Sequence, residues 1–346
     1  MATIFDVVTA PALAAYYLEN PMENPPYLLG AFFPSRKQLG TDLSYIKGAK
    51  GAVKPLSLSG YDAKAIPIDR EGFEKLMTEI PFFKNMMLIN EKQRKELLNF
   101  MAANNEAGIQ MVVNNIFNDQ ARLVDNAMLT LEMMRAQAIT TGKVTFSSNG
   151  QSITVDYGVP EDNFVDANWT VATSADPLND ILGWQDTVEA SYGTRPRTLI
   201  MNSKTFGLIQ KSDSIKDAIY VMGNGSVTPT RSRTADFIST EADVDIYIYN
   251  KGYMNGATFT KFIPDNTVVM LPNSTVGYMN FAPTPEETDL LTGSNANVSI
   301  IGEGIAVTMT KETDPVSVMT KVSMCALPSL EGADGIIVAD VSGAGL

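Results

Sequence analysis

Histidine is absent from this chain of 346 residues, and cysteine occurs once, as Cys325. The lack of histidine removes the usual general base near neutral pH, the imidazole of nucleophilic triads and the commonest ligand of transition metals. A single cysteine cannot form an internal disulfide, and the apolar residues around Cys325 favour a thiol buried on a strand over a reactive one. The sequence therefore predicts no catalytic residue, no metal site and no cofactor.

Positive charge is scarce, because 26 Lys and Arg residues stand against 39 Asp and Glu residues and give a net charge of −13. An acidic protein repels a phosphate backbone, which argues against direct readout of nucleic acid. The stretch 36–64 is an exception, with six basic residues against Asp42 and Asp62. This excess favours a segment that attaches to another copy of the chain, and a solvated basic loop is the alternative.

Long apolar runs are missing as well. Glu19, Pro21 and Glu23 interrupt the first apolar stretch, well short of the roughly 20 residues that a membrane span needs. No basic leader precedes that stretch, so we expect a protein that stays in the cytosol of the producing cell. Apolar residues nevertheless make up 45% of the chain, enough for one large core or two connected ones.

The first 84 residues differ from the rest in their content of proline and glycine. Residues 1–40 contain five prolines, a pattern that resists a continuous helix and indicates an arm lying along a surface. From 41 to 84, short strand-like pieces alternate with glycines, which predicts an extended β-hairpin loop.

A long helix is the clearest local prediction. Residues 91–140 contain no proline and are dense in Ala, Met, Leu, Glu and Gln. Within 107–140 the apolar residues recur at spacings of three and four, so one helix of roughly 50 Å is expected, with Gly142 as its stop signal. The apolar stripe includes Val113, Ile116, Val124, Met128 and Leu131.

The remainder of the chain mixes helices and strands. A hairpin is predicted over 143–157, and a helix over 176–192, which Asp176 can cap while Pro177 occupies the first turn. A helix beginning at Ser203 follows the apolar strand 198–201, and further helical turns cover 213–221. Residues 223–233 are predicted to be a loop. The other expected strands are 244–249, 257–262, 267–271, 305–310 and 316–326.

Four short motifs could carry chemistry, and each either fails to match its pattern or has a simpler interpretation. Gly302 and Gly304 lack the third glycine of a dinucleotide fingerprint, and Gly142 with Lys143 is followed by valine where a phosphate loop needs Ser or Thr. The acidic group Glu286, Glu287 and Asp289 could bind a cation, but a solvated acidic loop is favoured. Asp265 and Asn266 after Pro264 indicate a turn between strands.

The order of several short stretches resembles the lambda-type major capsid proteins of tailed phages, which have the HK97-like shell fold. Each stretch alone consists of common turn and strand residues, so their order and spacing carry the resemblance. The stretches are VDYGVPEDN (155–163), Trp169 with DPLNDI (176–181), LIMNSKTF (199–206), FIPDNTVVML (262–271) and 307–315 with the strand after it.

The resemblance implies an α+β, HK97-like architecture with an N-terminal arm (1–40) and an extended loop (41–84). A peripheral domain with a spine helix would span 85–175, an axial domain 176–292, and the chain would return to the peripheral domain over 293–346. The loop would reach a neighbouring subunit through Lys47, Lys50, Lys54 and Lys64. Some relatives weld such a loop by a Lys to Asn isopeptide bond, which we do not expect here.

The implied function is structural. Copies of the chain would form hexamers and pentamers of an icosahedral shell that encloses double-stranded DNA and matures by expansion of a procapsid. Scaffold and portal proteins would be partners, as decoration proteins are in many relatives. Assembly would take place in the host cytoplasm, and the protein would reside in the virion. One alternative is an encapsulin-like compartment shell, and another is an enzyme using carboxylates alone, for which no paired acids stand out.

Overall fold

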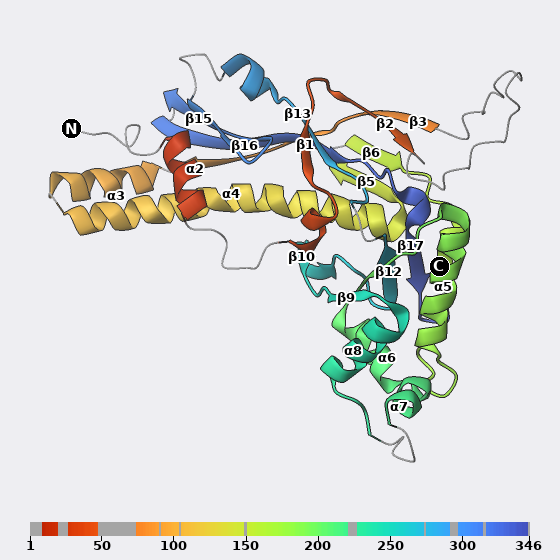
Figure 1. Ribbon diagram of the computed structural model, residues 1–346. Coiled ribbons are helices and arrows are strands. Elements are labelled where there is room, and N and C mark those ends of the chain that lie inside the picture. Colours follow the sequence, from red (N-terminus) through yellow and green to blue (C-terminus); the bar gives the residue numbers. More distant parts are fainter. Residues whose placement is uncertain are drawn as a thin grey trace, which may run out of the picture.

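The computed structural model shows two bodies that meet at a corner (Figure 1). The elongated body consists of a long helix beneath a sheet, and the smaller body hangs from one end of it, where a second sheet carries several helices. The structure describes residues 9–19, 27–47, 74–89, 91–103, 105–148, 151–220, 227–272, 275–290, 297–313 and 316–344.

Helix α4 (Glu106–Thr141) runs the length of the elongated body, with α3 (Glu91–Ala102) beside its first part. The side chain of Asn105 caps its start by accepting a hydrogen bond from the Gly108 amide at 3.0 Å. Gly142, with φ of 66°, ends the helix in the left-handed conformation that glycine adopts without strain. The predicted helix over 107–140 and its stop are both confirmed.

The apolar stripe of α4 packs against a six-stranded sheet. Val113, Ile116, Val124 and Leu131 are buried, and Met128 is partly buried against the same core. The ladder is antiparallel throughout except where β1 pairs with β13. The strands are β1 (Ser35–Lys37), β13 (Met279–Ala282), β16 (Val316–Pro328), β15 (Ile305–Thr313) and β14 (Asn297–Ile301) in that order, with β4 (Phe82–Ile89) also pairing with β16.

The smaller body is built on a five-stranded sheet. Its central strands are buried along almost their whole length because both faces of the sheet are covered. The strand order is β7 (Phe164–Asp166), β17 (Ile337–Asp340), β12 (Thr267–Leu271), β8 (Thr198–Met201) and β9 (Asp245–Ile248). The helices are α5 (Pro177–Tyr192), α6 (Ser203–Lys211), α7 (Asp213–Ile219) and α8 (Arg231–Ala242).

Three two-stranded hairpins complete the strand inventory of the described residues. The base of the predicted extended loop is present as the first of them, and the hairpin predicted over 143–157 is confirmed as the second. The hairpins are β2 (Asp42–Lys47) with β3 (Glu74–Glu79), β5 (Lys143–Ser148) with β6 (Gln151–Asp156), and β10 (Gly252–Asn255) with β11 (Thr258–Lys261).

The five-stranded sheet divides two apolar cores. Alternate residues of a strand point to opposite faces, and in β12 Val269 belongs to the larger core around α4 while Val268 and Met270 belong to the smaller core beneath α5, α6 and α8. In β17, Val338 faces the larger core and Ile337 faces the smaller one. The two bodies therefore share one sheet as a common wall.

Two local predictions were wrong. The proline-rich start was expected to resist a continuous helix, yet α2 spans Ala10–Glu19, because Pro11 lies in the first turn, where a missing amide donor is tolerated. The loop predicted over 223–233 ends early, since α8 begins at Arg231 and Thr230 caps it by accepting from the Arg233 amide. Residues 223–226 of that loop lie outside the described ranges.

Among the described helices, α4 included, none has the length and apolar character that crossing a bilayer requires.

The packing of α4 yields a stability prediction. Replacing Val113 or Ile116 by proline removes a backbone hydrogen bond in a buried stretch of the helix, and we expect a loss of about 3 kcal/mol or more in the free energy of unfolding. The exposed Asn115 offers a matched control, since Asn115→Ala should leave stability nearly unchanged. Urea denaturation followed by circular dichroism measures the free energy of unfolding of the proline variants and of the control. A proline variant as stable as the wild type would contradict the assignment of this stretch to a buried helix.

Candidate functional site

The lysines proposed for contact with a neighbour lie at or beyond the end of the β2–β3 hairpin. Lys47 is the last residue of β2 and pairs with Glu74, and its side chain is outside the described part. Lys50, Lys54 and Lys64 lie in the stretch 48–73, which the structure does not describe. Their role in contact stays a prediction.

A buried carboxylate on α4 joins three separate parts of the chain. Glu132 is 0% exposed. Its Oε1 accepts hydrogen bonds from the Leu29 amide at 3.0 Å and from the Tyr249 hydroxyl at 2.7 Å, and its Oε2 lies 3.3 Å from Arg135 Nη1. Leu29 belongs to the short 3-10 turn η1 (Leu28–Ala31), and Tyr249 follows β9 of the smaller body.

The electrostatics of this centre keep each partner in its bonding form. Burial raises the pKa of Tyr249 above its ordinary value, and the adjacent Glu132 carboxylate raises it further, so the phenol remains a donor. Burial lowers the pKa of Arg135, although its attraction to Glu132 opposes that shift. The guanidinium still carries a charge at neutral pH. Three parts of the chain are thus fastened to one carboxylate.

Helix α2 provides a second attachment of the N-terminal region to α4. The Tyr16 hydroxyl donates to Asn118 Oδ1 at 2.6 Å, and its ring packs against Phe117 with centroids 5.3 Å apart. Burial raises the pKa of Tyr17 to about 12, helped by its hydrogen bond to Asp125. These contacts attach α2 to the long helix.

The acidic group after β13 is not the solvated loop that the sequence favoured. Glu286 is 4% exposed, with Oε1 2.5 Å from Lys321 Nζ and Oε2 accepting from the Ser323 hydroxyl at 2.9 Å. Glu287 pairs with Lys37 of β1. The cation is thus supplied by lysines of neighbouring strands, a partner that the local sequence could not reveal. Asp289 has a side chain outside the described part.

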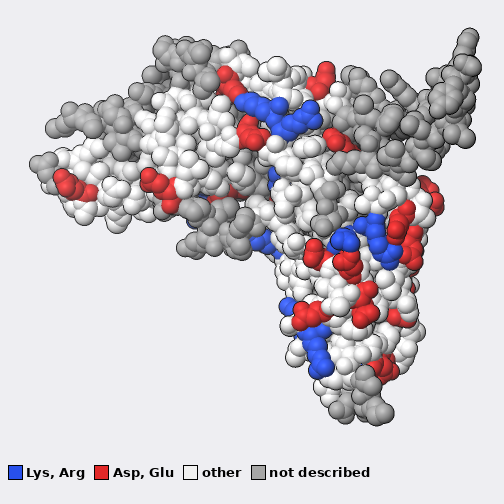
Figure 2. All heavy atoms as spheres, in the orientation of Figure 1, with Lys and Arg blue, Asp and Glu red and all other residues white. Residues whose placement is uncertain are grey.

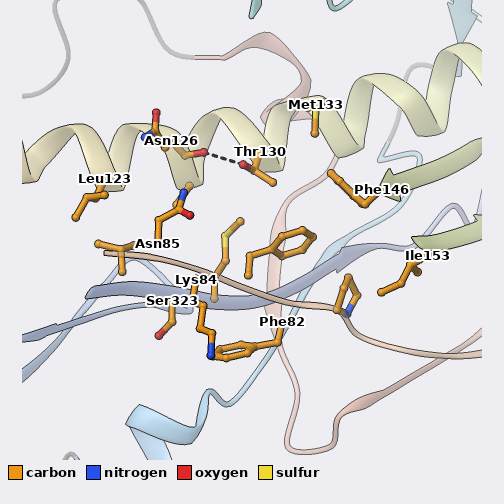
Figure 3. Close-up of a pocket in the computed structure, with 15 residues that line it drawn as sticks. Phe82, Lys84, Asn85, Leu123, Asn126, Thr130, Met133, Phe146, Ile153 and Ser323 are labelled. Carbon is orange, nitrogen blue, oxygen red and sulfur yellow. Dashed lines mark hydrogen bonds between the residues drawn. The ribbon is translucent and has the colours of Figure 1, made fainter. Parts of the chain in front are cut away.

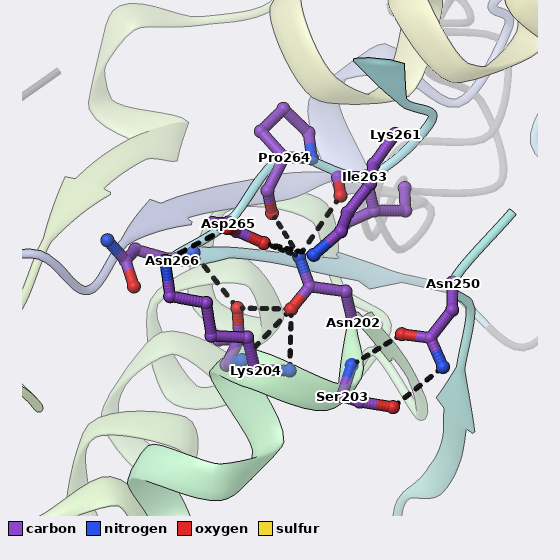
Figure 4. A network of polar contacts seen from close by, with 10 residues as sticks. Asn202, Ser203, Lys204, Asn250, Lys261, Ile263, Pro264, Asp265 and Asn266 are labelled. Atoms are coloured by element: carbon purple, nitrogen blue, oxygen red, sulfur yellow. Dashed lines mark hydrogen bonds and ion pairs between the residues drawn. The ribbon is translucent and has the colours of Figure 1, made fainter. Parts of the chain in front are cut away.

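The helix predicted to begin at Ser203 is capped by the residue before it (Figure 4). Asn202 is fully buried, and its Oδ1 accepts from the amides of Lys204 and Thr205, both at 2.9 Å. Its Nδ2 donates to the carbonyl of Pro264 at 2.9 Å, which holds the predicted turn between β11 and β12. By contrast, the predicted cap of α5 was wrong: the Asp176 side chain accepts from the Asn179 side chain and makes no capping bond to the helix backbone.

Asp265 in that turn has two cationic neighbours. Lys261 lies 2.5 Å from Oδ1 and Lys204 lies 2.9 Å from Oδ2 (Figure 4). Hydrogen bonds from these lysines lower the pKa of Asp265. These contacts close the turn between β11 and β12.

A cavity of about 420 Å³ opens between α4, β4, β16 and the β5–β6 hairpin (Figure 3). Much of its lining comes from Phe82, Phe83, Leu123, Phe146 and Ile153. The Thr130 hydroxyl, which also lines it, donates a hydrogen bond to the Asn126 carbonyl at 2.8 Å. The cavity contains no His, Cys, Asp or Glu side chain among the described residues that line it. Its chemistry suits apolar contact.

Titratable chemistry is sparse elsewhere in the described ranges. No group of three or more Cys, Asp and Glu side chains in them is arranged to hold a metal ion. Cys325 lies buried in β16, and burial raises the pKa of its thiol to about 11, so the predicted buried thiol is confirmed. Figure 2 shows acidic and basic side chains interspersed on the smaller body, whereas much of the elongated body's visible face is uncharged.

The buried carboxylate generates a prediction for the isolated subunit. Glu132→Ala should lower the free energy of unfolding by about 3–5 kcal/mol because three buried partners lose their acceptor. Tyr249→Phe should lower it by about 1.5–3 kcal/mol. Tyr247→Phe serves as a control, since that side chain is 39% exposed. Urea titrations report all three values, and unchanged midpoints for the first two variants would refute this account of the site.

Glu286 generates a pH prediction. Burial alone would raise its pKa, but hydrogen bonds from Lys321 and Ser323 outweigh that effect and lower it. A carboxyl whose pKa is depressed by folding contributes stability above its unfolded value, near 4.5, and loses that contribution as the pH falls through the folded value. Glu286→Gln should therefore flatten stability between about pH 5 and pH 3. Equal slopes for the variant and the wild type would show that the pair contributes nothing.

Comparison with known proteins identifies a family for this chain. The family model described as phage major capsid protein E matches residues 9–341. No curated protein matches the sequence significantly.

Solved structures share the fold at low sequence identity. A prophage capsid protein from E. coli CFT073 has 14% identity and a TM-score of 0.63, over 96% of this chain and 99% of that one. A phage-related protein from Bordetella bronchiseptica RB50 has 14% identity and a TM-score of 0.57, over 98% and 99%. The cyanophage A-1(L) capsid has 12% identity and a TM-score of 0.50, over 93% and 96%.

These structures establish the HK97-like capsid fold that the order of sequence motifs predicted. The family match favours a phage shell protein over the compartment shell that was the alternative. Because the family model covers nearly all of the sequence, this chain belongs to the phage major capsid protein E family.

Proposed function

We propose that copies of this chain assemble as hexamers and pentamers into the icosahedral head shell of a tailed phage. The observation that carries the proposal is the family match over residues 9–341, supported by the HK97-like arrangement of a long helix beneath a sheet with a second body at its end. The role is conformational and structural, and no catalytic residue, metal or cofactor takes part in it.

The shell would enclose double-stranded DNA without reading its sequence. The net charge of −13 supports this, because an acidic wall contains DNA without releasing the counterions that tighten binding. Low affinity of the inner surface for phosphate would leave the packaged genome free to be ejected.

The subunit would have an arm, an extended loop, a peripheral domain and an axial domain. Residues 1–40 are the arm, 41–84 the loop that reaches a neighbour, 85–175 and 293–346 the peripheral domain, and 176–292 the axial domain. The sheet shared by the two cores supports a rigid connection between the peripheral and axial domains, since β12 and β17 contribute residues to both cores. Lys47, Lys50, Lys54 and Lys64 give the loop its positive charge for contact with acidic neighbours.

Maturation would proceed from a procapsid to an expanded shell. Helix α4 is suited to act as the stiff spine of the subunit during this expansion. Its 36 residues form one continuous helix, and one face of that helix packs against the sheet. Scaffold and portal proteins are the proposed assembly partners, and a decoration protein is a further one. Assembly would take place in the host cytoplasm, and the mature protein would reside in the virion.

Deleting Gly48–Lys64 tests the assignment of the loop. The deletion leaves the paired part of the β2–β3 hairpin intact, so we expect folded, soluble subunits that fail to close shells. Electron microscopy and analytical ultracentrifugation of the wild type and the deletion variant, each co-expressed with scaffold, compare assembly directly. Circular dichroism provides the control for folding.

Closed particles from the deletion variant would contradict the role of the loop. A wild-type protein that forms no particle with its scaffold would instead contradict the shell function itself. We also expect the association of subunits to weaken as the salt concentration rises from about 0.05 to 0.5 M, because screening reduces the attraction of a basic loop for an acidic body.

A further inference from the structure

The β10–β11 hairpin presents an exposed apolar pair. Met254 is 61% exposed and Phe259 is 54% exposed. The two residues are direct cross-strand partners, so their side chains lie on the same face of the hairpin. The opposite face carries Tyr253, whose ring packs against Phe262 with centroids 5.8 Å apart. One face thus anchors the hairpin, while the other presents Met254 and Phe259, which we call the hairpin knob.

The ring of Phe259 is held against the hairpin backbone. A Cβ atom at Gly252 would lie 2.8 Å from Phe259 Cζ and 2.1 Å from the Thr260 carbonyl oxygen, so only glycine allows this packing. An aromatic side chain that is already oriented loses little conformational freedom when it docks. The knob therefore has the properties of an interface anchor, since large apolar groups that become buried dominate binding energy.

The cavity of about 420 Å³ beside the β5–β6 hairpin has a largely apolar lining, with Asn85, Asn126, Thr130 and Ser323 as its uncharged polar residues. An apolar cavity of about 150 Å³ accommodates benzene, so this one has room for a phenylalanine ring together with a methionine side chain. Phe82 and Ile153 in its lining are 40% and 36% exposed, which leaves the cavity open to solvent. Lys84 is the one charged residue of its described lining, and its ammonium lies 5.6 Å from the Phe82 ring centroid.

The knob and the cavity cannot meet within one copy of the chain. The hairpin lies on one side of α4, next to the smaller body, while β5, β6 and β16 lie on the other side of that helix (Figure 1). The knob can enter such a cavity only on a second copy. A contact that joins two different surfaces repeats from copy to copy, and it closes a ring when the rotation permits.

We propose that the hairpin knob of one subunit inserts into the cavity between α4, β4 and the β5–β6 hairpin of a neighbouring subunit. This inference rests on the proposed shell function, because it requires copies to associate. An exposed apolar pair and an open, largely apolar cavity lie on the same chain, so a second copy is the occupant that can supply the pair. Insertion buries both surfaces, and the apolar area removed from water stabilises the contact.

Truncating the knob tests its contribution to assembly. Phe259→Ala and Met254→Ala should raise the subunit concentration needed for half-maximal assembly by roughly ten- to a hundredfold, while circular dichroism and the thermal midpoint stay close to wild type. Thr258→Ala is the matched control, because its exposed side chain lies on the opposite face of the same hairpin. Wild-type assembly by both knob variants would overturn the inference and leave the shell function intact.

Cysteine cross-linking identifies the partner surface. Particles assembled from a mixture of Phe259→Cys and Ile153→Cys subunits, at a subunit concentration high enough to offset the loss of the Phe259 ring, should form a cross-linked dimer on a non-reducing gel, and particles of either variant alone should not. The buried Cys325, whose thiol has a raised pKa, is present in both and provides the background. No dimer from mixed particles, or a dimer from Phe259→Cys particles alone, would overturn the insertion of the knob into this cavity.

Discussion

The subunit depends on a carboxylate that water does not reach. Burying a charge is costly unless every partner is in place, and removing one partner leaves the others uncompensated. Glu132 satisfies this condition with a backbone amide of η1, the hydroxyl of Tyr249 and the guanidinium of Arg135. The N-terminal segment, the long helix and the smaller body must therefore reach their positions together, which links local order in each to order in the other two.

The shared sheet provides the apolar counterpart of this polar link. In β12 and β17, successive residues belong alternately to the two cores, so a displacement of the smaller body would disturb packing on both faces. A shell subunit with this construction transmits force between its bodies instead of bending at a loose linker. The knob and the cavity, by contrast, lie on opposite sides of α4, where they are available to neighbours.

The sequence predicted those parts whose signals are local. Helix α4 has a long apolar stripe and a stop at Gly142, and the order of short motifs identified the HK97-like fold. Strands β1 and β7 have three residues each, and they exist only because distant strands pair with them. Glu132 was missed because a Glu with Arg three positions later resembles an ordinary surface pair. Its one local signal was a charge on an apolar stripe.

Hydrogen–deuterium exchange on the wild type and on Glu132→Ala tests most directly whether one carboxylate couples three parts of the fold. If Glu132 couples these parts, the variant loses protection in η1 and around Tyr249 together, although Leu29 and Tyr249 are 220 residues apart in the sequence. Loss of protection confined to α4 around position 132, with η1 and the Tyr249 region exchanging as in the wild type, would contradict it.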